Sequence, residues 1–145
     1  MRKYFASART VFIVVVIVLS GCATTSSTRS PGVDLSKIRT VYVIKLGADE
    51  RGINSVIADE LNALGYKAKT GLEEEQPHDV DAVLMYRDHW MWDVTMYMLR
   101  LNIEVRDPRN GSLLAEGESY KPSLQRRSPI EMVKEVLGSI FAAAE

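Results

Sequence analysis

The hydrophobic positions divide the chain into one unbroken apolar run near its start and a longer part in which apolar and polar residues are mixed. The run covers residues 11–19, VFIVVVIVL, and residues 1–9 contain three basic side chains and no acidic one. A helix of this length rises only about 14 Å, whereas a membrane-spanning helix needs roughly 20 residues. A basic start and a short apolar core followed by small residues are typical of a secretory signal peptide. We therefore expect residues 1–21 to be a removed leader.

The first elements of the folded part are predicted from residues 38–70. Residues 38–46, IRTVYVIKL, are rich in β-branched and aromatic side chains and favour a buried strand. Apolar residues then recur at helical spacing from Ile53 to Leu64, and Gly65 follows as a helix-ending glycine. Residues 66–70 complete a strand–helix–strand unit, which predicts two parallel strands joined by a right-handed crossover.

Three more strands are expected after an acidic polar loop over residues 71–79. Residues 81–90, DAVLMYRDHW, favour a strand. From Met98 onward apolar and polar residues alternate, as in a strand with one face in water. Residues 107–111, DPRNG, have the composition of a turn, because Asn-Gly tolerates positive φ angles. Residues 112–119 return as the hairpin partner.

The last helix is expected to begin at Ser128. Ser128 at the N-cap, Pro129 at the first position and Glu131 at the third form the pattern of a capping box. Apolar residues continue at helical spacing as far as Phe141. The element order is then β-α-β-β-β-β-α. Two helices on one face of a mixed sheet of about five strands make a two-layer α/β sandwich, which we expect as a single domain over residues 37–145.

The surroundings of the single cysteine change the picture from a secreted domain to a membrane-anchored one. Leu19-Ser20-Gly21-Cys22, directly after the leader, resembles the lipobox of bacterial lipoproteins. The resemblance implies cleavage before Cys22, a lipid on its sulfur and an acyl chain such as palmitate on the new amino terminus. Several acyl chains together hold a protein firmly to a membrane. Ala23 in place of Asp favours the outer membrane, facing the periplasm, over the inner membrane.

Residues 22–36 are predicted to be the lipidated cysteine and a flexible linker. Residues 23–36, ATTSSTRSPGVDLS, are rich in Ser and Thr and have no apolar period. Residues 1–36 are therefore expected to contribute nothing to the fold. A single Cys also excludes an internal disulfide and any Cys-based zinc site.

Charge and motifs exclude several classes of function. The whole chain has a net charge of −1, and 15 of its 18 Lys and Arg remain after residue 21 against all 19 Asp and Glu, a net charge of −4. No basic excess is available to bind nucleic acid. The sequence contains no P-loop, dinucleotide-binding glycine pattern or zincin motif. His78 and His89 lack the helical spacing of metal ligands, and Glu73-Glu74-Glu75 lack that of a calcium loop. We expect no cofactor and no metal.

One stretch of unusual side chains, residues 86–93 (YRDHWMWD), is the candidate binding surface. In an extended chain Tyr86, Asp88, Trp90 and Trp92 share one face, and Asp93 lies on the other. Such aromatic side chains could bind a partner, or they could simply cover the sheet as part of the core. The stretch is similar to one that precedes a hairpin in uncharacterised small α/β lipoproteins of proteobacteria. That resemblance implies no activity.

These observations favour a non-enzymatic lipoprotein, a protein-interaction or assembly module of the cell envelope. Its expected partners are membrane lipid, through acylation of Cys22, and an envelope protein. Two alternatives stay open. The Trp90 and Trp92 face could bind a small ligand or a glycan such as peptidoglycan, or a hydrolase site could assemble around His89 with Asp88 and a serine.

Overall fold

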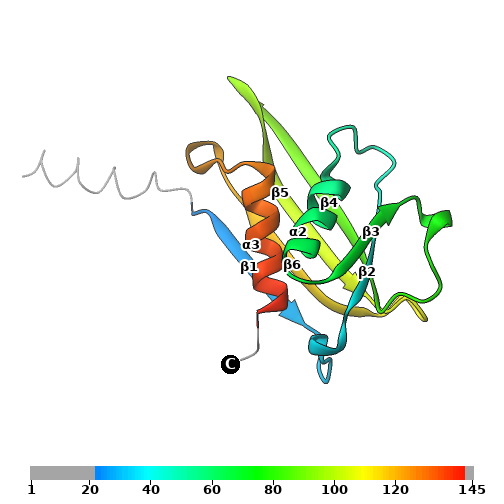
Figure 1. Ribbon diagram of the computed structural model, residues 1–145. Helices are drawn as coiled ribbons and strands as arrows, with labels where there is room; N and C mark the ends of the chain where they lie inside the picture. Colours follow the sequence, from blue (N-terminus) through cyan, green and yellow to red (C-terminus); the bar gives the residue numbers. More distant parts are fainter. Residues whose placement is uncertain (1–21, 143–145) are drawn as a thin grey trace, which may run out of the picture.

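The computed structural model of the protein describes residues 22–142, which form a mixed sheet with two helices packed against it (Figure 1). The strands are β1 (Thr24–Arg29), β2 (Thr40–Ile44), β3 (Lys67–Gly71), β4 (Ala82–Asp93), β5 (Thr95–Arg106) and β6 (Leu113–Tyr120). The helices are α2 (Ile53–Ala63) and α3 (Pro129–Phe141), with short 3₁₀ helices η1 (Leu35–Lys37), η2 (Glu73–Glu75) and η3 (Ser123–Gln125). The predicted signal peptide, residues 1–21, lies outside the described residues.

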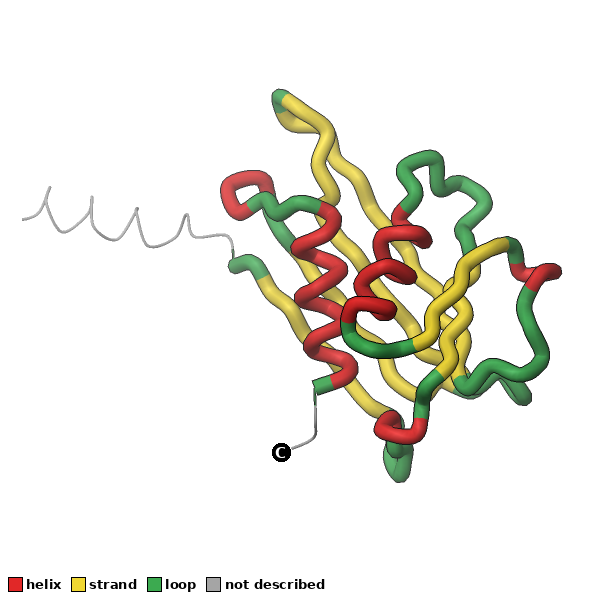
Figure 2. Tube along the Cα trace, in the orientation of Figure 1, coloured by secondary structure: helices red, strands yellow, loops and turns green. Residues whose placement is uncertain are grey.

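The sheet has the strand order β1-β6-β5-β4-β2-β3. β2 is parallel to both of its neighbours, β3 and β4, and the remaining pairs are antiparallel. The β2–α2–β3 unit is therefore the parallel crossover that the sequence predicts. Both helices lie on one face of the sheet, α3 over β1, β5 and β6, and α2 over β2 and β3 (Figure 2). The predicted α/β fold with two helices is confirmed, with six strands instead of about five.

The additional strand, β1, occupies the segment in which we expected a flexible linker, so the linker prediction for residues 22–36 is wrong in this part. β1 pairs antiparallel with β6 along its whole length, from Thr24 opposite Tyr120 to Arg29 opposite Ala115. All six of its side chains are exposed. The sequence of β1 has no apolar residue that would predict a strand. β1 is held in place instead by backbone hydrogen bonds to a strand about ninety residues later in the chain.

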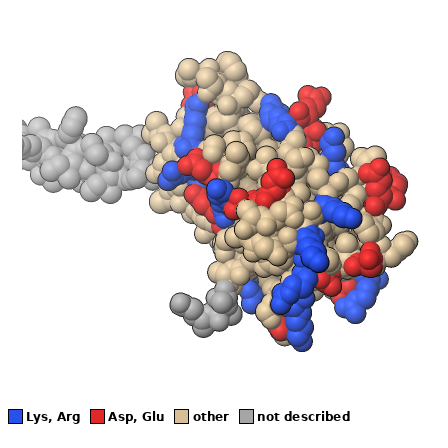
Figure 3. Space-filling model, viewed as in Figure 1, with Lys and Arg blue, Asp and Glu red and all other residues tan. Residues whose placement is uncertain are grey.

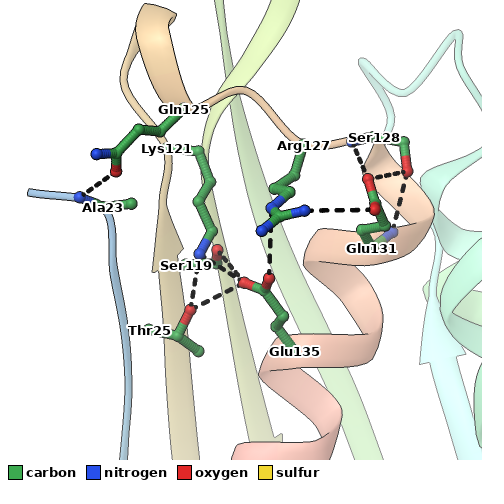
Figure 4. Close-up of polar contacts among 9 residues, drawn as sticks. All are labelled: Ala23, Thr25, Ser119, Lys121, Gln125, Arg127, Ser128, Glu131 and Glu135. Carbon is green, nitrogen blue, oxygen red and sulfur yellow. Dashed lines mark hydrogen bonds and ion pairs between the residues drawn. The ribbon is translucent and has the colours of Figure 1, made fainter.

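Polar side chains also attach β1 to α3 (Figure 4). The Lys121 ammonium lies 2.6 Å from a carboxylate oxygen of Glu135, and the Thr25 hydroxyl donates to the same oxygen at 3.0 Å. Lys121 is buried, so the nearby carboxylate of Glu135 offsets the cost of removing its ammonium group from water. Burial disfavours the ionised form of Glu135, but hydrogen bonds from Lys121 and Thr25 outweigh that effect and leave its pKa below the usual range.

The core lies between the sheet and the two helices. Alternate apolar residues of β5 and one face of each helix are fully buried there. Gly117 in β6 lets α3 approach closely, since a Cβ at this position would lie 2.8 Å from the Cγ1 atom of Ile140. Within residues 22–142, neither α2 nor α3 has the length and apolar character of a membrane span.

The predicted turn and cap chemistry is confirmed. The Ser128 hydroxyl accepts from the Glu131 amide at 3.3 Å, and the Glu131 carboxylate accepts from the Ser128 amide at 2.9 Å. Gly65, after α2, and Gly111, in the β5–β6 turn, have φ angles of 95° and 71°. Both glycines therefore adopt the left-handed conformation that their positions require.

Candidate functional site

The β4–β5 hairpin projects beyond the rest of the sheet (Figures 1 and 2). Each of its strands has 12 residues, more than any other strand in the described part of the chain. β4 continues to Asp93, three residues past its predicted end, and β5 begins at Thr95 instead of Met98. The chain reverses at Val94, a turn that the sequence does not predict. The candidate residues 86–93 therefore run from the core of the domain out to an exposed tip.

The candidate residues, which we expected to form one surface, differ in burial according to their position along this hairpin. Tyr86 is 3% exposed and belongs to the core. Asp88 and Trp90 are half-buried, and Trp92 is 70% exposed. Asp93 is exposed next to the turn. The prediction of a shared binding face is wrong for Tyr86, because the inner part of β4 packs under the helices.

Tyr86 fixes the loop between β2 and α2. Its hydroxyl donates to the Asp49 carboxylate at 2.6 Å, and that carboxylate also accepts from the backbone amides of Arg51, Gly52 and Asn54. Burial, followed by the bond to Asp49, raises the pKa of Tyr86 far above its usual range. Burial opposes ionisation of Asp49, but the hydrogen bonds outweigh it and lower its pKa. The pair is a structural brace whose polar groups are engaged with one another and with the loop.

Trp90 and Asp88 hold the other side of the same loop. The indole N–H of Trp90 donates to the Asp88 carboxylate at 2.6 Å. The Arg51 guanidinium lies 4.2 Å above the centre of the Trp90 ring, a cation–π contact. Trp90 also packs against the edge of the hydrophobic core. These two residues therefore join the hairpin to the β2–α2 loop and leave little surface for a ligand.

The tip of the hairpin is braced by η3 and the residues after it. The Ser123 hydroxyl donates to the Asp93 carboxylate. The Arg126 guanidinium donates to the Asp93 carbonyl at 2.6 Å and to the Thr95 hydroxyl at 2.7 Å, and lies 4.3 Å from the centre of the Tyr97 ring. Asp93 is thus paired with Arg126 at 3.2 Å and does not present an unbalanced charge.

Exposed apolar side chains surround this braced tip. We call them the tip patch: Met91, Trp92, Val94 and Met96 of the hairpin, and Leu124 of η3. Val94 is 84% and Leu124 is 89% exposed. In Figure 3 the end of the projection is drawn without any Lys, Arg, Asp or Glu atoms, and charged atoms begin just below it. Met91 and Trp92 are consecutive in β4, so the apolar side chains cover both faces of the hairpin end. Exposed apolar surface gathered at one end of a domain in this way is typical of an interaction site.

Cys22, where the sequence predicts the lipid, lies on the same side of the molecule as η3. Cys22 is exposed, and β1 begins two residues later. The Ala23 amide donates to the Gln125 side chain at 2.9 Å (Figure 4), and Gln125 is the last residue of η3. η3 therefore contacts the start of β1 on one side and the hairpin tip on the other. Nothing in the sequence indicates that the predicted anchor and the aromatic stretch meet at one structure.

The two histidines do not assemble a catalytic site. Asp88 and His89 are consecutive in β4, so their side chains lie on opposite faces of the sheet, and Asp88 is bonded to Trp90. A catalytic pair of these two residues, as required by the hydrolase alternative, is therefore excluded. Within residues 22–142, no cluster of His, Cys, Asp and Glu could hold a metal ion.

His78 lines an open cleft of about 490 Å³ at the end of the sheet away from the tip. The acidic groups of this cleft are already paired. The Asp107 carboxylate accepts from the Arg109 guanidinium at 2.6 Å, an interaction that lowers its pKa to about 2. Asp81 accepts from the backbone amides of Arg39 and Thr40. The cleft is a surface hollow lined by ion pairs and capped backbone, with no arrangement that activates a nucleophile among the residues the structure describes.

Comparison with known proteins identifies the fold. No protein-family model matches the sequence, and no curated protein matches it. Two crystal structures of a PelC dodecamer from Paraburkholderia phytofirmans, one of them of a variant with a single substitution, have this fold. They match with a TM-score of 0.62 at 16% and 17% identity, covering 81% and 82% of this chain and 97% and 98% of theirs. At this identity the likeness concerns the fold.

Proposed function

We propose that this protein is a lipid-anchored lipoprotein of the cell envelope, held to the periplasmic side of the outer membrane, where it acts without catalysis as an interaction or assembly module. The observation that carries the proposal is the position of Cys22, which only Ala23 separates from a strand of the sheet. The chain between Cys22 and β1 can span only about 7 Å. A lipid on Cys22 would therefore hold the sheet itself at the membrane surface, without an intervening linker.

The hydrogen bonds and the exposure of the candidate residues favour a role in binding over a role in catalysis. The carboxylates of Asp49, Asp88 and Asp93 are each bonded to a side chain that positions a loop or a turn. The side chains that remain exposed at the site are mostly apolar, and they lie on a projection instead of in a hollow. Such a surface is suited to contact with another macromolecule or a membrane, and poorly suited to enclosing a sugar or a small molecule.

The likeness to PelC supports one mode of assembly. The PelC protein of Paraburkholderia phytofirmans is a dodecamer with this fold. We infer that the present chain, which covers almost the whole of that protein, also associates with further copies of itself. Its short tether would place all copies at the same height above the membrane, which raises their effective concentration for side-by-side contact.

Lipidation is tested by producing the full chain in a Gram-negative bacterium grown with labelled palmitate. We expect label in the protein, an intact mass equal to residues 22–145 plus lipid, and recovery with the outer-membrane fraction. The matched control is Cys22→Ser, which should remain uncut and unlabelled. A mature wild-type protein whose Cys22 carries no lipid would contradict the proposal.

Assembly is tested separately on the detergent-solubilised lipoprotein. Light scattering and native mass spectrometry should give a mass several times that of one chain, and cross-linking in intact envelopes should give the same series of species. A strictly monomeric protein in both measurements, with no cross-linked partner of any kind, would contradict an interaction or assembly role.

A further inference from the structure

The tip patch is the most exposed apolar surface of the described domain. Trp92 is 70% exposed, and the side chains at the very end of the projection are exposed further. These side chains are supported from below by Arg126, which bonds to both Asp93 and Thr95. The patch is therefore held in a defined position by the residues beneath it.

The requirements of folding do not explain why the turn residue Val94 has an apolar, β-branched side chain. Val94 has a φ of 63°, and it is the only described residue other than glycine with a positive φ. A β-branched side chain is unfavourable in this conformation, and hairpin turns of this kind usually have Gly, Asn or Asp. Valine is thus a poor choice for the turn, yet it occupies the outermost position. This outlier favours a role for the side chain outside the domain.

The predicted anchor identifies what lies outside the domain at this end. Gln125 bonds to Ala23, next to Cys22, while Ser123 of the same 3₁₀ helix bonds to the hairpin tip. Leu124, between these two contacts, is almost fully exposed. Acyl chains on Cys22 would therefore enter the bilayer beside Leu124 and on the same side as the tip, as the positions of β1, η3 and the hairpin in Figure 1 show.

The chemistry of the patch matches the interfacial region of a bilayer. Trp is enriched at the level of the lipid headgroups, and Val, Met and Leu favour the acyl boundary just below it. The one acid at the tip, Asp93, is neutralised by Arg126. Arg127, just beyond, is directed at Glu131 and Glu135 of α3, so its charge is also balanced within the domain.

We infer that the β4–β5 hairpin tip, together with Leu124, inserts into the lipid interface next to the anchor and fixes the orientation of the domain on the membrane. The inference rests on the proposed lipidation of Cys22. With two points of contact, the acyl chains and the tip, the domain cannot rotate freely about its short tether. The open face of the sheet and the helical face would then both stand upright from the membrane.

Bromolipid quenching of tryptophan emission tests the insertion. The purified lipoprotein is reconstituted into phosphatidylcholine–phosphatidylglycerol vesicles with or without brominated acyl chains. Only two tryptophans are present, so the difference between wild type and Trp92→Phe reports Trp92. We expect the Trp92 component to lose at least about half of its emission on brominated vesicles. The matched control adds Leu72→Trp to Trp92→Phe. Leu72 is 49% exposed and follows β3, far from the tip, so its emission should be unchanged.

Val94→Asn separates insertion from folding. Asn tolerates the left-handed conformation, so the melting temperature should stay the same or rise. Quenching of Trp92 should nevertheless fall, because a polar amide replaces the outermost apolar group. If the tip were only structural, this substitution would leave quenching unchanged. Leu124→Ser should act in the same direction without affecting the turn.

The outcomes distinguish the inference from the proposal on which it rests. An intact mass without lipid would refute lipidation, and coupling a maleimide lipid to Cys22, the single Cys, then tests the tip on its own. Equal quenching of wild type and Trp92→Phe would overturn the insertion. Equal quenching at Leu72→Trp would also overturn it, as would cross-links that show the tip buried against a second copy.

Discussion

The ion pair between Lys121 and Glu135 should be the polar interaction on which the attachment of β1 depends most. We consider Glu135→Gln in the chain starting at residue 22 with Cys22→Ser. The Lys121 side chain is only 10% exposed and that of Glu135 is 34% exposed. The substitution keeps an acceptor for Thr25 but leaves the Lys121 ammonium buried without an opposite charge.

The expected loss of stability lies between two limits. Removing one partner of a fully buried ion pair costs about 3–5 kcal/mol, whereas an exposed pair contributes about 0–1 kcal/mol. Because Glu135 is partly exposed, we expect a loss of about 2 kcal/mol. With an m-value of about 2 kcal/mol/M, the midpoint of urea denaturation should fall by roughly 1 M with an unchanged slope.

Two comparisons make this result specific. Lys121→Met removes the buried charge, so the double variant with Glu135→Gln should recover part of the loss and give a coupling energy of about 1 kcal/mol or more. The matched control is Lys37→Met. Lys37 forms a longer pair, 3.9 Å from Asp34, and the two side chains are 84% and 53% exposed, so its loss should stay below about 1 kcal/mol.

The pH dependence gives an independent check. The pKa of Glu135 is lower in the folded state, so its contribution is complete above the unfolded value of about 4.3 and is lost as the pH falls through the folded value. When the pH is lowered through this range, the free energy of unfolding of Glu135→Gln should therefore fall less than that of the wild type. If Glu135→Gln and Lys37→Met shift the urea midpoint equally, the argument from burial is refuted.

Three further results are expected. Ser128→Ala should cost about 1 kcal/mol in urea denaturation, because it removes the N-cap of α3, and no change would mean that the cap does not matter here. Gly117→Ala should cost about 1–3 kcal/mol, because its Cβ would overlap the Ile140 side chain, and the thermal melt measures this. A chain starting at Ser36 lacks β1 and exposes the edge of β6, so it should aggregate at concentrations at which the longer chain is monodisperse by light scattering.

The parts of the fold that are encoded locally are predictable from the sequence. The α2 stripe, the Asn110-Gly111 turn and the Ser128 capping box each depend on neighbouring residues, and each lies where the pattern places it. β1 depends instead on hydrogen bonds to β6 and α3. Its Thr and Ser side chains resemble those of a linker, because an exposed edge strand buries nothing.

The sequence predicts where the candidate residues lie along the chain, but it does not predict how deeply each side chain is buried. Alternation correctly places Trp90 and Trp92 on one side of a strand, but it cannot show that the strand leaves the core between Tyr86 and Trp92. The reason is the turn at Val94, which lacks Gly, Pro or Asn and so hides the end of the hairpin. Leu124 gives no signal either, since a single Leu in a polar connection is ordinary in sequence.

The ladder between β1 and β6 also sets an order of folding events, because its two strands lie near opposite ends of the described chain. β1 is the first strand to be synthesised, whereas β6 and the helix that contacts β1 are among the last elements to follow. Until β6 is in place, the residues that follow Cys22 are not held in the sheet and stay accessible. Closure of the sheet brings those residues against the domain, so under the proposed lipidation Cys22 would be modified before the fold is complete.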